Sequence, residues 1–147
     1  MRKILLDTNF LLDFIDETRP ESEYACELFR RTVSGEFSGV IAASSLKDMY
    51  CIACKRGSEQ EARDWVNMFI WAFDVEPLDV EICAIAASSD EPDFEDGCVR
   101  ASAERAQVDF IITRDCTAFA RSWVKAYSAR EFLELFPARE SGTGEES

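Results

Sequence analysis

Five aspartates occupy positions where the chain is expected to change from one secondary structure to another. Asp7 follows three aliphatic residues, and Asp115 follows a second run of β-forming residues far along the chain. Asp48, Asp93 and Asp96 lie between them, each near the expected start of a helix. In an open parallel sheet, such positions face one crevice at the carboxyl ends of the strands, where ligands bind. The spacing therefore predicts a carboxylate site for Mg²⁺ or Mn²⁺.

The residue types restrict the chemistry of this site. Asp7 and Asp115 belong to different expected strands, and burying two carboxylates together without a cation would raise a pKa sharply. The chain has no histidine, which excludes every mechanism that uses a histidine base and limits a zinc site to cysteine and carboxylate ligands. Water activated by a bound metal ion is therefore the most plausible nucleophile.

Each acid also has an ordinary structural interpretation, because aspartate is favoured at the first residues of helices. The segment from Ser45 to Asp48 resembles a capping box with Asp in place of Glu, and the segment from Asp93 to Asp96 has the same spacing. For a single residue, capping is the better interpretation. The set of acids, at the ends of separate elements, favours the metal site.

The expected elements alternate between strands and helical segments. The strands are expected at residues 3–7, 38–42, 74–76, 110–113 and 124–127, the last at a sheet edge. Helices are expected before residue 34 and at 45–55, 62–73, 80–87, from 93 onward, and at 129–136, with a short helical turn through 119. The stripe Ala62, Trp65, Val66, Phe69, Ile70 and Phe73 and the stripe Val80, Cys83, Ala84 and Ala87 are expected to face the core.

This order predicts an α/β fold, a three-layer α/β/α sandwich around a mostly parallel sheet of about four to five strands. With 147 residues, of which 47% are hydrophobic, we expect one domain over residues 1–137. Residues 138–147 are expected to be a disordered acidic tail, because residues 140–147 include no apolar member. The sequence contains no internal repeat.

The composition restricts the cellular location and the binding partners that we expect for this chain. The net charge of -13 argues against general affinity for nucleic acid, so any such role must be local. No apolar run approaches the length of a membrane span, and a cytoplasmic protein is expected. The six cysteines are expected to be reduced core thiols. Cys51 and Cys54 form a C-x-x-C string inside an expected helix, and the stripe of Leu46, Met49, Tyr50 and Ala53 beside Cys54 favours packing over redox or zinc chemistry.

Several segments together resemble the PIN-domain family. They are Leu5–Asn9, Ala43–Asp48, Asp93–Asp96, Ile111–Asp115 and, in the closing helix, Ser128–Leu133. Each motif is short, and the match lies in their order and spacing over about 135 residues. The resemblance implies a metal-dependent nuclease fold found in toxin ribonucleases of bacterial toxin-antitoxin pairs and in RNA-processing enzymes.

The resemblance also implies roles for individual residues. Asp7, Asp96 and Asp115 would be ligands of Mg²⁺ or Mn²⁺, with Asp48 as the fourth acid and Asp93 available to a second ion. Asn9 and Thr113 would orient this shell through hydrogen bonds. The family more often has Glu at the position of Asp48. The reaction would be hydrolysis of RNA phosphodiester bonds to 5′-phosphate and 3′-hydroxyl products.

The expected partners are an RNA substrate, a small antitoxin protein whose basic side chain enters the acidic crevice, and a second copy of the chain in a homodimer. Two other functions compete with the nuclease. The first is a binding module that keeps the fold without turnover, which would have less reason to keep all four acids. The second is a phosphotransferase with Asp7 as nucleophile, but its motif needs a second Asp where this chain has Asn9.

Overall fold

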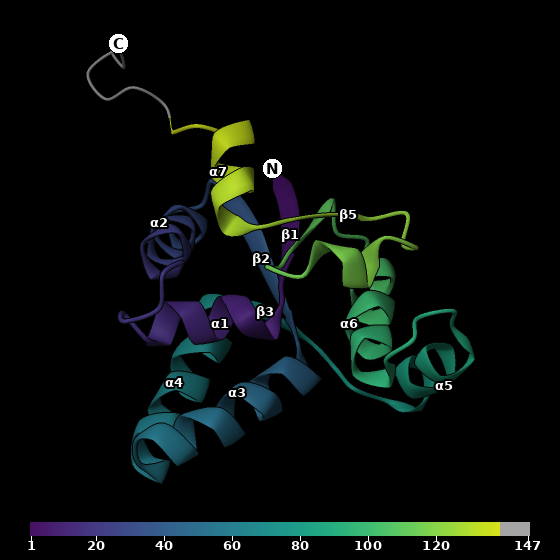
Figure 1. Ribbon diagram of the computed structural model, residues 1–147, viewed down its shortest axis with the longest axis horizontal. Coiled ribbons are helices and arrows are strands. Elements are labelled where there is room, and N and C mark those ends of the chain that lie inside the picture. The colour runs from purple at the N-terminus through teal and green to yellow at the C-terminus, as the bar shows by residue number, and fades with distance from the viewer. Residues whose placement is uncertain (139–147) are drawn as a thin grey trace.

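The computed structural model describes residues 1–138 and forms three layers, with a parallel sheet between two groups of helices (Figure 1). The strands are β1 (Arg2–Leu6), β2 (Phe37–Ala42), β3 (Asp74–Glu76), β4 (Phe110–Ile112) and β5 (Lys125–Tyr127). The α-helices are α1 (Thr8–Ile15), α2 (Ser22–Val33), α3 (Ala43–Arg56), α4 (Glu59–Ala72), α5 (Val80–Ser88), α6 (Phe94–Arg105) and α7 (Ala129–Leu135), and η1 (Cys116–Phe119) is a 3₁₀ turn. The predicted α/β fold is confirmed.

The sheet has the order β3-β2-β1-β4-β5, and each neighbouring pair is parallel. Strand β1 is therefore central, and its residues Ile4, Leu5 and Leu6 are fully buried because helices cover both faces. In this arrangement β5 is an edge strand, as predicted. All five carboxyl ends meet at one edge of the sheet, which is where α1 and α3 begin.

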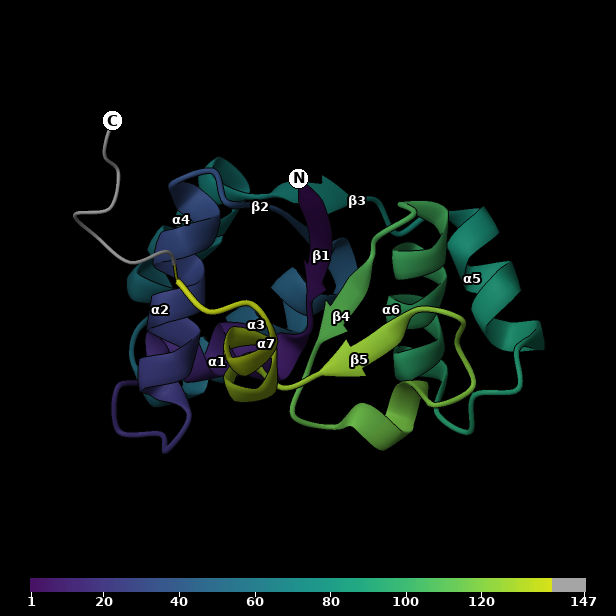
Figure 2. The same ribbon diagram turned by 90° about the horizontal axis from the view of Figure 1, so that it is seen from above.

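Alternate residues of β1 supply two separate cores. Ile4 and Leu6 belong to the larger core, which also contains Phe69 and Phe132 from α4 and α7. Leu5 belongs to the smaller core on the opposite face, beneath α6. Figure 2 shows α5 and α6 on one side of the sheet and α1, α2, α4 and α7 on the other.

The structure corrects the face predicted for α5. Ile82 and Ala86 are its buried residues, whereas Val80 is 85% exposed and Ala84 and Ala87 are exposed. The reason is that α5 packs mainly against α6, so only the narrow stripe of residues that contacts α6 is buried. On α4, Phe69 is buried as predicted but Ile70 is 53% exposed.

The cysteines also differ from the prediction. All six are free thiols, but Cys98 alone is buried, and Cys26 and Cys51 are exposed on helix surfaces. The apolar stripe predicted for α3 is confirmed at three positions, because Leu46, Met49 and Ala53 are buried. Within residues 1–138, no helix combines the length and apolar content that a membrane span requires. The predicted tail lies outside the described residues, except for Ala138.

Candidate metal centre

Asp7 lies where β1 ends and α1 begins. Its backbone N–H donates to the carbonyl oxygen of Ile112 at 3.0 Å, which continues the ladder between β1 and β4. Its backbone is extended, and its side chain caps α1 because Oδ1 accepts the N–H of Thr8 at 2.8 Å. The residue is only 7% exposed. A strand end and a helix start thus hold one carboxylate below the surface of the sheet edge.

Thr113 joins Asp7 to the loop that carries Asp115. Its hydroxyl is buried and donates to Oδ2 of Asp7 at 2.9 Å. The hydroxyl oxygen Oγ1 of Thr113 accepts hydrogen bonds from Nδ2 of Asn9 and from the backbone N–H of Asp115, each at 3.0 Å. Asn9 in turn accepts the backbone N–H of Arg114 at 3.0 Å. Asn9 and Thr113 therefore fix the position of Asp7 relative to Asp115, which is the arrangement expected of residues that orient a ligand shell.

Asp93 and Asp96 begin α6 on the opposite side of the sheet from α1. Asp93 is the N-cap, and its Oδ1 accepts the N–H groups of Glu95 at 2.7 Å and Asp96 at 3.2 Å. The capping role predicted for Asp93 is therefore confirmed. Asp96 is the N3 residue and is half-buried, so that its carboxylate is held against the sheet edge by the first turn of the helix.

The capping role predicted for Asp48 is wrong. The helix α3 begins at Ala43, with the backbone of Ala42 at the N-cap and no side-chain cap. Asp48 therefore lies in the second turn, and Ser45, the expected cap, is fully buried inside the first turn. The strand β2 passes directly into the helix, which moves the helix start by two residues and turns Asp48 toward the sheet edge.

The pKa shifts show that the four acids share one electrostatic field. Burial raises the pKa of Asp7; the N–H of Thr8 and the hydroxyl of Thr113 oppose this, and the charges of Asp115 and Asp48 add to it. Burial, followed by the charges of Asp93, Asp7 and Asp115, raises the pKa of Asp96 to about 6. Asp7 therefore lies within electrostatic reach of Asp48 and Asp115, and Asp96 lies within reach of Asp7 and Asp115.

The four side chains are of the kind that binds a hard cation, but their present spacing does not form a complete set of ligands. Among residues 1–138, no three acidic or cysteine side chains are already close enough together to hold a metal ion. All four donors are carboxylates, as Mg²⁺ and Mn²⁺ prefer, and such ions keep several water ligands of their own. Burial is the largest cause of the raised pKa values of Asp7 and Asp96, the charges of nearby acids add to it, and a bound cation would lower both pKa values. The donor set therefore fits a divalent ion that is held partly through water.

Glu91 is a further buried acid that the motifs did not reveal. Its side chain is fully buried, and its charge acts on Asp96. One carboxylate oxygen accepts Nη1 of Arg100 at 3.1 Å, and the other has no hydrogen-bond partner within residues 1–138. Arg100 also contacts Asp90 and Glu104, and donates to the carbonyl oxygen of Arg121. The acid-rich run before α6 was the available signal, but nothing local identified its cation.

Asp13 is a second residue that the sequence reasoning missed. It is 4% exposed on α1 and accepts Nε of Arg114 at 2.8 Å, with Arg19 at 3.5 Å. An acid inside an otherwise apolar helix was a visible signal. Through Arg114, this contact holds the loop between β4 and η1, which carries Asp115, against α1.

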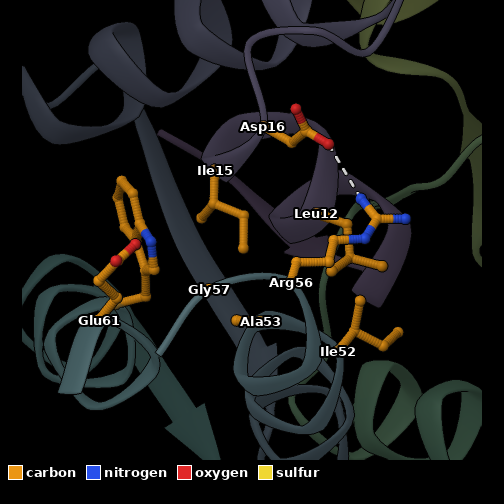
Figure 3. Close-up of a pocket in the computed structure, with 9 residues that line it drawn as sticks. Leu12, Ile15, Asp16, Ile52, Ala53, Arg56, Gly57 and Glu61 are labelled. Carbon is orange, nitrogen blue, oxygen red and sulfur yellow. Dashed lines mark hydrogen bonds and ion pairs between the residues drawn. The ribbon is translucent and has the colours of Figure 1, made fainter. Parts of the chain in front are cut away.

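A separate pocket lies between α1, α3 and α4 (Figure 3). Its volume is about 200 Å³, and Leu12, Ile15 and Ile52 supply apolar walls. The ion pair between Arg56 and Asp16, at 2.9 Å, crosses one side of it. None of the four acids lines this pocket, so the candidate metal centre is a different site.

Comparisons with known proteins agree with the fold and the order of the motifs. A family model described as a PIN domain matches residues 3–117. A comparison with curated protein sequences gave no match. Thirty solved structures match, and the three described next illustrate them.

The first structure is VapC20 from Mycobacterium tuberculosis, described as a sarcin-ricin loop cleaving toxin, with TM-score 0.67 and 15% identity over 80% of this chain and 94% of that chain. A toxin-antitoxin complex from Klebsiella pneumoniae has TM-score 0.64 and 20% identity over 86% and 97% of the two chains. DNA-bound VapBC from Salmonella typhimurium has TM-score 0.65 and 18% identity over 88% and 99%. At these identities the likeness shows the fold.

Proposed function

Because the chain belongs to the PIN-domain family, we propose that it is a divalent-metal-dependent endoribonuclease and the toxin component of a toxin-antitoxin pair. The observation that carries this proposal is the buried carboxylate of Asp7, whose pKa is raised by burial and by the charges of two other candidate acids. A residue that only caps a helix has no need of two further acids close enough to raise its pKa. The toxins and complexes among the similar structures support the same reaction class.

In the proposed site, Asp7, Asp96 and Asp115 hold Mg²⁺ or Mn²⁺, Asp48 acts as the fourth acid, and Asp93 is available to a second ion. The bound ion would supply a water of lowered pKa and would stabilise charge on the phosphoryl oxygens. Thr113 orients Asp7 through the 2.9 Å hydrogen bond, and Asn9 fixes the hydroxyl of Thr113. The acids then align the attacking water with the phosphodiester for in-line displacement.

A small basic antitoxin is the proposed protein partner. A guanidinium or ammonium group beside the four candidate acids would relieve their repulsion much as a metal ion would. The complexes from Klebsiella pneumoniae and Salmonella typhimurium contain toxin-antitoxin pairs with this fold. We also propose a homodimer, which light scattering of the purified chain would test.

The decisive experiment is cleavage of end-labelled single-stranded RNA with Mg²⁺ or Mn²⁺ by the wild type and by Asp96→Asn. We expect cleavage by the wild type, none after chelation with EDTA, and none by the variant. Equal products from both proteins would indicate a contaminating nuclease. Absence of cleavage by the wild type on several RNAs, including ribosomal RNA, would favour a PIN-fold binding module without turnover.

A further inference from the structure

The segment after the candidate metal centre is one of the stretches in which basic residues outnumber acids. Residues 114–127 contain three basic residues and one acid, as α3 does, in a protein with a net charge of -13. This segment runs from Arg114 through η1 to the edge strand β5. It differs from α3 in that an exposed tryptophan lies between its basic residues.

Residues 121–125 lead into β5 and expose their charged and aromatic side chains. Arg121, Trp123 and Lys125 are exposed, whereas Ser122 is partly buried and Val124 is 2% exposed. The three exposed side chains are therefore available to a partner in solution. Trp123 is 66% exposed, although a tryptophan normally buries most of its surface. We call Arg121, Trp123 and Lys125 the basic strip.

Hydrogen bonds attach the basic strip to the flank of α6. Arg100 donates to the carbonyl oxygen of Arg121 at 3.1 Å. Ser122 donates to Glu104 at 2.7 Å and accepts the N–H of Val124 at 3.1 Å. Figure 2 shows this segment following η1 and passing beside α6 before β5. The candidate centre and the strip therefore share α6, with Asp96 in its first turn and the strip beside its middle and last turns.

The charge of Arg121 is unusually free for an arginine of this chain, and Lys125, like the other lysines of residues 1–138, forms no ion pair. Within residues 1–138, every arginine except Arg121 either forms an ion pair with a carboxylate or lies over an aromatic ring. In the same range, Arg121 and Lys125 form no ion pair, although the charge of Arg121 reaches Asp90. Two unneutralised cations with an exposed indole between them match the chemistry of single-stranded nucleic acid, whose phosphates bind cations and whose bases stack on aromatic rings.

We propose that the basic strip binds the RNA strand along the flank of α6, away from the nucleotide at the candidate metal centre, with Trp123 stacking on a base and Arg121 and Lys125 contacting phosphates. This inference rests on the proposed function. It explains how a strongly acidic chain can hold a polyanion, because the strip supplies local attraction against the net negative charge of the molecule. The other highly exposed tryptophan, Trp71, is 74% exposed on α4, and no basic residue lines the groove beside it.

Fluorescence anisotropy with a 5′-fluorescein single-stranded RNA of mixed sequence, about 20 nucleotides long, tests this proposal. Every protein carries Asp96→Asn, which is expected to prevent cleavage, and binding is measured between 20 and 150 mM NaCl. The test variants are Trp123→Ala, Trp123→Phe and the pair Arg121→Gln with Lys125→Gln. The matched controls are Trp71→Ala and the exposed Lys55→Gln on α3. Melting temperatures verify that each variant folds.

We expect Trp123→Ala to weaken binding about tenfold and Trp123→Phe to retain most of the affinity, because stacking tolerates another aromatic ring. The double glutamine variant should bind more weakly and reduce the slope of log affinity against log salt by about 1.4, as expected for two lost phosphate contacts on a single strand. Neither control should change the affinity by more than about twofold.

The proposal is overturned if the strip variants bind like the controls, or if the Asp96→Asn protein does not bind RNA at 20 mM NaCl. A change in oligomeric mass of Trp123→Ala by light scattering, with unchanged RNA affinity, would instead identify the strip as a protein interface. Failure of the proposed function can be distinguished from failure of this proposal. Cleavage by the wild type tests the function, whereas RNA binding by the Asp96→Asn proteins tests the strip.

Discussion

Asp96 carries a carboxylate that the folded protein holds in an unfavourable environment. Burial, followed by the charges of Asp93, Asp7 and Asp115, raises its pKa from 3.8 to about 6. Between these two pH values the folded state binds more protons than the unfolded state, so this group makes the protein less stable as pH rises. A functional site often keeps such a cost, since removing the charge would also remove the ligand.

Asp96→Asn is therefore expected to melt at a higher temperature than the wild type at pH 7 in metal-free buffer. The gain should be complete above about pH 6 and should disappear below about pH 3.8, where the wild-type carboxyl becomes protonated in both the folded and the unfolded state. Thermal melts from pH 3.5 to 7.5 would measure it. Asp64→Asn, on the exposed face of α4, controls for net charge. An equal gain in that control, or a lower melting temperature for Asp96→Asn, would contradict the crowding of the acids.

Thr113 is the residue on which the geometry of Asp7 depends most directly. It is 1% exposed, and its hydroxyl makes three hydrogen bonds, to Asp7, Asn9 and the backbone of Asp115. A side chain without a hydroxyl would leave three partners unsatisfied in a site with little water.

Thr113→Val is accordingly expected to weaken Mn²⁺ binding by roughly tenfold to a hundredfold, the usual effect of losing a residue that orients a ligand. Thr113→Ser keeps the hydroxyl and should bind nearly as well as the wild type. Isothermal titration calorimetry with Mn²⁺ would measure both. Equal affinities for the valine variant and the wild type would show that Asp7 does not depend on this hydrogen bond.

At the scale of the elements, the segment between α5 and α6 is held by one arginine. Arg100 contacts Asp90 at 2.6 Å and the fully buried Glu91 at 3.1 Å, and it is itself largely covered. This contact fixes the start of α6, where Asp93 and Asp96 lie. A buried ion pair adds little net stability, but removing one partner leaves the charge of the other buried and unpaired.

Arg100→Met should destabilise the fold by about 3 kcal/mol, because Glu91 would remain buried without its partner. The double variant Arg100→Met with Glu91→Met should recover much of this loss, since two apolar side chains leave no charge unpaired. Urea unfolding would give both values. A loss below about 1 kcal/mol for the single variant would mean that Glu91 escapes to solvent and does not anchor the segment.

For the whole molecule, the dominant fact is the excess of acids, 29 against 16 basic residues. Many described arginines are already paired, so the remaining carboxylates repel one another across the surface. Screening acts strongly on such exposed charges, with a Debye length of about 10 Å at 0.1 M salt.

Raising NaCl from 20 to 300 mM is therefore expected to increase the melting temperature by a few degrees at pH 7, because salt weakens this repulsion. Differential scanning calorimetry would measure the change. MgCl₂ at matched ionic strength should give a larger increase in the wild type than in Asp7→Asn if the candidate centre binds the ion. A melting temperature that falls with NaCl would show that the ion pairs outweigh the repulsion.

The sequence by itself determined the class of fold and the candidate acids, because these depend on local patterns. Apolar runs of strand length, separated by helical segments, require a parallel α/β sheet, and aspartates after β1 and β4 must lie at its carboxyl edge. The capping role of Asp93 could also be predicted from local sequence, because its side chain contacts backbone N–H groups only two and three residues further along.

Only the tertiary structure decided the contacts between segments far apart in the chain. The covered face of α5 depended on its packing against α6, and the start of α3 depended on the direct passage from β2. The partner of Glu91, the anchoring of Arg114 by Asp13 and the position of the basic strip beside α6 all join residues that no periodicity relates. Burial and charge pairing are properties of the packed chain, and they therefore could not be determined before the elements met.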